Sequence, residues 1–156
     1  MEDVVDFTKK HSEEDEAEAL EQIEFTFLEP AETMYHSLKN LLLGYSTCTG
    51  NQVPQLADKI IEKKNLSLAI IEDEQDDDGL DTVFSIIGLV ELNDTLGKQI
   101  KEFFIKKCRT HCKEKAAAIA EILEKKQVCL LINDRFVNLP PKLVPVQHQT
   151  FTSELK

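Results

Sequence analysis

The sequence predicts an α/β fold, in which a β-sheet is flanked by helices on its faces. Residues 66–71 and 82–92 are rich in Leu, Ile and Val on both of their faces, which is typical of central strands covered from two sides. Segments with helical spacing of apolar residues alternate with such strands along the chain. The expected order is therefore strand, helix, helix, strand, strand, one or two helices, strand and helix.

The first three elements follow from short-range patterns. Residues 23–28 place apolar side chains at every second position, which predicts a strand. Pro30 suits the first turn of a helix that Gly44 can end, and Pro54 opens a second helix that ends near Asn65. Apolar residues at helical spacing form the expected buried faces of these helices: Met34, Leu38, Leu41 and Leu42 in the first, and Leu56, Ala57, Ile60 and Ile61 in the second.

The later elements begin with a capped helix. Asn93 and Asp94 can cap a helix that starts near Thr95, and the poor helix formers at 110–112 predict a break in it. The expected buried face of this helix consists of Ile100, Phe103, Phe104 and Cys108. A helical segment at 116–123, a strand at 128–132 and a last helix from about Leu143 complete the order.

Length and charge limit the classes of function. The 156 residues fit one domain, with an acidic tail at 1–22 that we expect to be disordered and a folded part at 23–156. The net charge of −11 argues against non-specific nucleic-acid binding and against docking on anionic membranes. A basic protein partner fits this charge, because opposite potentials steer association. Acidity that only keeps the protein soluble is the alternative.

Other general features predict an intracellular protein without a recognisable catalytic motif. No apolar run approaches the roughly 20 residues of a membrane-spanning helix, and the acidic N-terminus has no signal-peptide core. Four cysteines give no disulfide framework, which fits a reducing compartment. The sequence contains no nucleophile elbow, P-loop or dinucleotide fingerprint, since its five glycines are all isolated.

The connection between the two central strands is the most acidic part of the folded region. Its glycine, Gly79, would stand at position six of a calcium-binding EF-hand loop, but the bidentate acid of position twelve is replaced by Ser85, and strands flank it instead of helices. We therefore expect a hairpin connection whose charges project into solvent, either as a partner-binding loop or as a solvated linker. Its carboxylates are Glu72, Asp73, Glu74, Asp76, Asp77, Asp78 and Asp81.

A zinc site is a second metal hypothesis. Cys108, His111 and Cys112 stand at i, i+3 and i+4, so a helix would place them on one face. A structural zinc site needs four ligands, and nothing in the sequence brings Cys129 or Cys48 close to these three. Packing in the core or at an interface is the favoured role for the cysteines.

Residues 128–146, VCLLINDRFVNLPPKLVPV, resemble the BCCIP family, which includes the fungal Bcp proteins. The resemblance extends from about residue 23 to 156 through pieces that occur in the same order. These pieces are IEF at 23–25, SLKNLLL at 37–43, the acidic connection, VFSIIGLVEL at 83–92 and the helix that carries Cys108 and Cys112.

The resemblance implies a nuclear, non-enzymatic interaction protein without a cofactor. Members of this family are described as adaptors for a breast-cancer susceptibility protein in DNA repair and for a cyclin-dependent-kinase inhibitor in cell-cycle control. Fungal members resemble chaperones or transport factors for a large-subunit ribosomal protein and a lipid kinase. The family fold is similar to that of the GCN5-related acetyltransferases (GNAT), with a mixed sheet. Family members are about twice this length, so the chain looks truncated relative to them and incomplete at its C-terminus.

The turn at residues 92–97 bears on enzymatic activity. Acetyltransferases of the resembled fold hold the coenzyme pyrophosphate there, on backbone amides of a glycine-rich turn at a helix N-terminus. This chain has one glycine in the turn, Gly97, and an aspartate, Asp94, whose charge would repel phosphate. The sequence thus favours an adaptor or chaperone for basic protein clients over an acetyltransferase-like enzyme or a calcium- or zinc-binding module.

Overall fold

The computed structural model describes residues 5–6, 23–73 and 77–155, and its strands form one sheet in chain order, β1-β2-β3-β4-β5. The strand at residues 5–6 lies within the segment 1–22, whose other residues fall outside the described part. The predicted strands are confirmed, and the last one ends three residues later than expected. The strands are β1 (Val5–Asp6), β2 (Glu24–Leu28), β3 (Ser67–Glu72), β4 (Val83–Glu91) and β5 (Cys129–Arg135).

The predicted order of helices and strands is also confirmed. The first predicted helix consists of a 3-10 turn η1 (Glu32–Met34), the helix α1 (Tyr35–Leu41) and a second 3-10 turn η2 (Leu42–Tyr45). The break expected at 110–112 separates two helices. The other helical elements are α2 (Val53–Glu62), η3 (Lys64–Leu66), α3 (Thr95–His111), α4 (Lys113–Lys125) and α5 (Leu143–Glu154).

The expectation of a mixed sheet is wrong for the described residues, because all four strand pairings are antiparallel. The physical reason is the number of helices between neighbouring strands. A parallel pair needs a crossover that carries the chain back to its starting end, usually through one helix. Here a pair of helices connects β2 to β3, and another pair connects β4 to β5, so each strand starts where the previous one ended.

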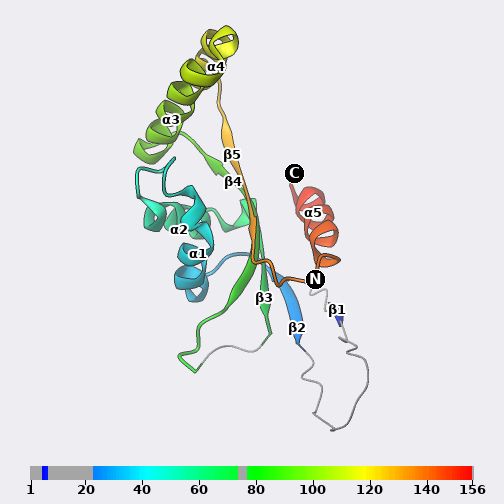
Figure 1. Cartoon of the computed structure of the whole chain (residues 1–156). Helices are drawn as coiled ribbons and strands as arrows, with labels where there is room; N and C mark the ends of the chain where they lie inside the picture. Colours follow the sequence, from blue (N-terminus) through cyan, green and yellow to red (C-terminus); the bar gives the residue numbers. More distant parts are fainter. Residues whose placement is uncertain (1–4, 7–22, 74–76, 156) are drawn as a thin grey trace, which may run out of the picture.

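The two faces of the sheet are covered by different helices (Figure 1). Helices α1 and α2 pack on one face and α5 packs on the other. Along β3, Ala69 and Ile71 point toward α1 and α2, whereas Leu68 and Ile70 point toward α5. This alternation confirms that the apolar central strands are buried from both sides.

A β-bulge at Phe84 shifts this alternation near the start of β4. Ile70 pairs with Ser85 and Ile71 pairs with Val83, so Phe84 has no partner residue on β3. The shift turns Val83 toward α1, where its amide donates a hydrogen bond of 2.8 Å to the Ser37 hydroxyl. The Phe84 ring lies on the opposite face, with the α5-side residues.

Helix α5 is joined to the sheet by one buried glutamine, Gln147, which is fully buried. Its amide nitrogen donates to the carbonyl oxygen of Leu68 on β3 over 2.9 Å. Its amide oxygen accepts a hydrogen bond of 2.8 Å from the hydroxyl of Ser85 on β4. Because buried polar groups are stable only when they are paired, these bonds fix the position of α5 across two strands.

Helices α3 and α4 are joined at Cys112 and contact each other, and this helical hairpin extends past the end of the sheet (Figure 1). The predicted buried face of α3 is therefore only partly correct. Ile100, near the sheet, is fully buried, but Phe103 and Cys108 are half-buried and Phe104 is 37% exposed. Among the described residues, no helix combines the length and the apolar character that crossing a bilayer requires.

Replacing Gln147 by Leu is expected to lower the free energy of unfolding by about 1–3 kcal/mol, because the variant leaves buried polar groups without their partner. Urea unfolding measures this change, and Gln149→Leu is a matched control, since residue 149 is exposed on the same helix. A loss in Gln147→Leu no larger than that in the control would contradict the role of this residue.

Candidate partner-binding surfaces

The acidic connection is a hairpin that joins β3 to β4, as expected. The Glu72 amide donates to the Thr82 carbonyl over 3.4 Å, and the Asp73 amide donates to the Glu24 carbonyl over 3.0 Å, so the ladder continues past both strands. Asp77 and Asp78 are exposed at its tip. Glu74 and Asp76 lie outside the described residues.

Asp73 and Asp81 of this hairpin bond to neighbouring elements, and for Asp81 the expectation of a solvent-projecting charge is wrong. Asp81 is only 8% exposed, accepts a hydrogen bond from the Thr33 hydroxyl, and donates its amide to the Thr33 carbonyl over 3.3 Å. Asp73 accepts a bond of 3.1 Å from the Thr26 hydroxyl. The returning strand passes under η1, where a buried carboxylate is tolerated because it is hydrogen-bonded.

The fold does not bring the candidate ligands of the calcium or zinc hypothesis together. Ser85, at the position of the bidentate calcium ligand, is buried in β4 and bonded to Gln147. Within residues 5–6, 23–73 and 77–155, no group of three His, Cys, Asp or Glu side chains is close enough to hold a metal ion. All four cysteines are free thiols, and burial raises the pKa of the Cys48 thiol above its usual range.

In the turn between β4 and α3, the Asp94 carboxylate caps the N-terminus of the helix. Asp94 is the N-cap of α3 and accepts a hydrogen bond of 2.8 Å from the Gly97 amide. The Lys59 ammonium from α2 lies 2.8 Å from the other carboxylate oxygen and also donates to the Glu91 carbonyl. The turn therefore joins α2, β4 and α3 through one ion pair and one cap.

The glycine of this turn has a packing role. A Cβ atom added to Gly97 would lie 2.5 Å from the backbone of Leu92, closer than real Cβ atoms approach. The first turn of α3 thus rests directly on the end of β4. With Asp94 at the helix N-terminus and a single glycine used for packing, the residues present do not fit a coenzyme pyrophosphate.

Opposing effects of burial, hydrogen bonding and charge determine the pKa of Asp94 in this turn. Partial burial acts to raise it, but the hydrogen bonds from Lys59 and from the Gly97 amide, together with the positive charge of Lys59, lower it below the usual aspartate value. The ionised form is therefore the one that the folded state stabilises.

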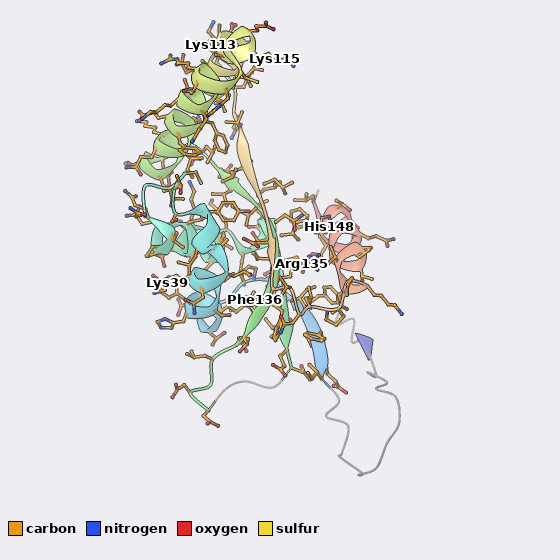
Figure 2. The ribbon with its side chains drawn as sticks, viewed as in Figure 1. Lys39, Lys113, Lys115, Arg135, Phe136 and His148 are labelled. Carbon is orange, nitrogen blue, oxygen red and sulfur yellow. The ribbon has the colours of Figure 1, made fainter. Side chains whose placement is uncertain are left out.

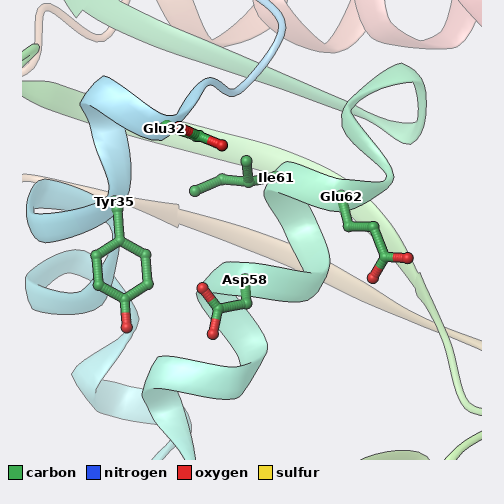
Figure 3. A pocket seen from close by; sticks show the side chains of 5 residues that line it. All are labelled: Glu32, Tyr35, Asp58, Ile61 and Glu62. Atoms are coloured by element: carbon green, nitrogen blue, oxygen red, sulfur yellow. The ribbon is translucent and has the colours of Figure 1, made fainter.

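A groove of about 520 Å³ runs between the first two helices and was not predicted from the sequence (Figure 3). Tyr35 and Ile61, both half-buried and packed against the core, form its apolar part. Glu32 from η1 and the α2 residues Asp58 and Glu62 line the rest, and all three are exposed. In Figure 3, the Tyr35 ring on α1 and the Asp58 carboxylate on α2 face each other across the opening.

The signal that could have revealed this groove is the spacing of its acids. Asp58 and Glu62 are four residues apart on α2, so they share the face next to the apolar one. Their position opposite Glu32 depends on how α1 packs beside α2, which sequence spacing does not specify.

Basic side chains gather on a different part of the molecule. Residues 98–126, which form most of the α3–α4 hairpin, hold nine Lys and Arg and four Glu. Lys113 and Lys115 lie at the tip of this hairpin, far from the sheet, whereas Lys39 lies on α1 (Figure 2). Acidic and basic surfaces are thus separated along the fold.

A comparison with protein-family models decides the family. The model described as BCCIP matches residues 21–156, most of the chain. The chain belongs to the BCCIP family. The segment that carried the resemblance, 128–146, forms β5, the following turn and the start of α5. Its buried residues include Ile132, Leu139 and Leu143, so this BCCIP segment closes the sheet and anchors α5.

Curated relatives of the chain come from animals, a plant and a fungus. The chain is 30% identical over 148 aligned positions to the human BRCA2 and CDKN1A-interacting protein, which covers 85% of this chain and 46% of the relative. It is 28% identical over 141 positions to the Protein BCCIP homolog of Arabidopsis thaliana, covering 86% and 41% respectively. It is 24% identical over 169 positions to Protein bcp1 of Schizosaccharomyces pombe, covering 95% and 58%. The chain therefore spans about half the length of the curated relatives it matches.

Replacing Asp94 tests the cap and the ion pair separately. Asp94→Ala is expected to lower the free energy of unfolding by about 1–2 kcal/mol at pH 7, whereas Asp94→Asn keeps an oxygen for the Gly97 amide and loses less.

Because folding lowers the pKa of Asp94, its charge stabilises the fold above the ordinary aspartate pKa of about 4. This stabilisation is lost as the pH falls through the lower pKa of the folded state. The stability difference between wild type and Asp94→Asn, measured by urea unfolding, should therefore shrink in acid. A difference that does not change with pH would contradict the ion pair.

Proposed function

We propose that this BCCIP-family chain is a non-enzymatic adaptor or chaperone that binds basic protein partners. The observation that carries the proposal is the separation of charge. Outside residues 98–126, the chain holds nine Lys and Arg against 25 Asp and Glu, and the described part exposes acids at the hairpin tip and along α2. Such a surface attracts cationic proteins and repels anionic ones. The names of its relatives are also those of interacting proteins, not enzymes.

The relatives suggest which partners to test. The human relative is named for interaction with BRCA2 and CDKN1A, so the counterparts of these proteins are the first candidates for this chain. A basic ribosomal protein of the large subunit is a further candidate client, which would give the chain a role in protein escort and transport. With these partners the chain would act in the nucleus, in cell-cycle control and DNA repair.

We also propose that the chain shares the fold of the GCN5-related acetyltransferases but does not bind their coenzyme. It is supported by the order of elements, in which β4 leads through a short turn into the N-terminus of α3. In this turn the amide of Gly97 is already bonded to the Asp94 carboxylate. A helix N-terminus that holds its own anion has lost most of its attraction for a phosphate.

Neutralising five acids of the hairpin is expected to weaken binding of a large-subunit ribosomal protein. The variant Glu72→Gln/Glu74→Gln/Asp76→Asn/Asp77→Asn/Asp78→Asn leaves Asp73 and Asp81 in place, because they bond to the body of the fold. Affinity at low salt should fall by about three- to thirtyfold, since each exposed charge contributes little on its own. Calorimetric titrations at several salt concentrations should also show a shallower salt dependence.

A control and a contradicting result are available for this experiment. Asp81→Asn should change stability, measured by thermal unfolding, without changing affinity. If the neutralised variant binds with unchanged affinity and unchanged salt dependence, the hairpin does not contact the partner.

A further inference from the structure

We propose that the groove between α1 and α2 is the docking site for a Lys- and Arg-rich segment of the protein partner. The segment places an apolar side chain against Tyr35 and Ile61 and its cationic side chains against Glu32, Asp58 and Glu62. This inference rests on the proposed function, because it names the surface on which a basic partner binds. It is independent of the acidic hairpin, since none of the hairpin residues that the structure describes line the groove.

The floor of the groove suits an apolar side chain. Tyr35 and Ile61 are packed against the core cluster on the α1–α2 face of the sheet, yet each keeps part of its surface open to the groove. The volume of about 520 Å³ lies within the range of sites that take a ligand. An apolar side chain that covers this floor removes hydrophobic surface from water, which favours binding.

The rim of the groove carries negative charge that the fold leaves unbalanced. Among the described residues, no Lys, Arg or His side chain lies within ion-pair distance of Glu32, Asp58 or Glu62. Lys59, their neighbour on α2, is 12% exposed and already pairs with Asp94. The rim therefore offers its three charges to a partner.

The arrangement of these charges favours a peptide segment over a single ion. The three carboxylates are not grouped closely enough to coordinate one metal ion together. They stand instead on both walls of the groove, with Asp58 and Glu62 separated by one turn of α2. Several cations spaced along one chain match this pattern, as in a segment whose Lys or Arg residues flank an apolar residue.

The groove continues along α2 into a second hollow of about 260 Å³, which shares Asp58 and Glu62 and reaches the first turn of α3 at Thr95 and Leu96. A segment longer than the first groove can thus follow α2 toward α3. The Asp94 carboxylate also lines this second hollow. Lys59 lines this hollow too and pairs with Asp94, so the charge that attracts a cationic occupant along this path comes from Asp58 and Glu62.

One lysine of the protein itself lies beside the groove. The Lys39 ammonium lies over the Tyr35 ring, 4.9 Å from its centre, in a cation–π contact. Its charge opposes an incoming cation, so its removal should strengthen binding. Figure 2 shows that Lys115, at the tip of the α3–α4 hairpin, lies far from Lys39 and gives a matched control with the same change in charge.

The probe is a fluorescently labelled peptide in which Lys residues flank Leu residues at helical spacing, titrated with the whole chain at low salt. Asp58→Asn/Glu62→Gln is expected to weaken its binding by about three- to tenfold. Glu114→Gln/Glu124→Gln, which removes two exposed charges from α4, should leave binding nearly unchanged. Lys39→Gln should strengthen binding, and Lys115→Gln should not.

A second peptide tests the apolar contact. When Ser replaces each Leu of the probe, affinity for the wild-type chain should fall, because the floor of the groove loses its occupant. Thermal unfolding of each variant confirms that the fold is intact, which the exposure of the four substituted acids favours.

The outcomes separate failure of the groove as the docking site from failure of the proposed function. Binding of the Leu/Lys peptide that weakens equally in both acid double variants overturns the groove as its site and leaves a basic-partner function standing. Failure of the wild-type chain to bind either this peptide or the ribosomal protein overturns both. Equal affinity for the Leu and Ser peptides overturns the apolar part of the docking site.

Discussion

Burial of β3 and β4 on both faces is the constraint on which the rest of the structure depends. Neither strand can offer a face to water, so helices must cover both sides of the sheet. Helices α1 and α2 cover one side, and α5, brought back by the turn after β5, covers the other. The few buried polar contacts follow from this arrangement, because Gln147 holds α5 to both strands and Lys59 holds α2 to the end of β4.

The sequence predicted the order of elements because their signals are local. Apolar residues on both faces marked β3 and β4, and the poor helix formers before Lys113 marked the break between α3 and α4. The antiparallel pairing could have been inferred from the paired helices, but the mixed sheet came from the resemblance instead. Burial of Asp81 and exposure of Phe104 could not be inferred, since both depend on where distant elements pack.

The segment that reveals the BCCIP family and the surface proposed to bind partners are different parts of the molecule. Residues 128–146 form the edge strand and the anchor of α5, so their sequence pattern reflects the requirements of the fold. The groove lies on the opposite face, between α1 and α2, and its three acids are exposed. A scaffold of this kind can keep its core while its partners differ, because the two sets of residues do not overlap.

Hydrogen–deuterium exchange of the chain alone and with a bound basic partner tests most directly the claim that partners bind on the α1–α2 face. Slower exchange is expected at residues 32–35 and 53–62 on binding, with no change in α5, whose contacts belong to the core. Slower exchange confined to α5 or to the α3–α4 hairpin, with none at the groove, would contradict it.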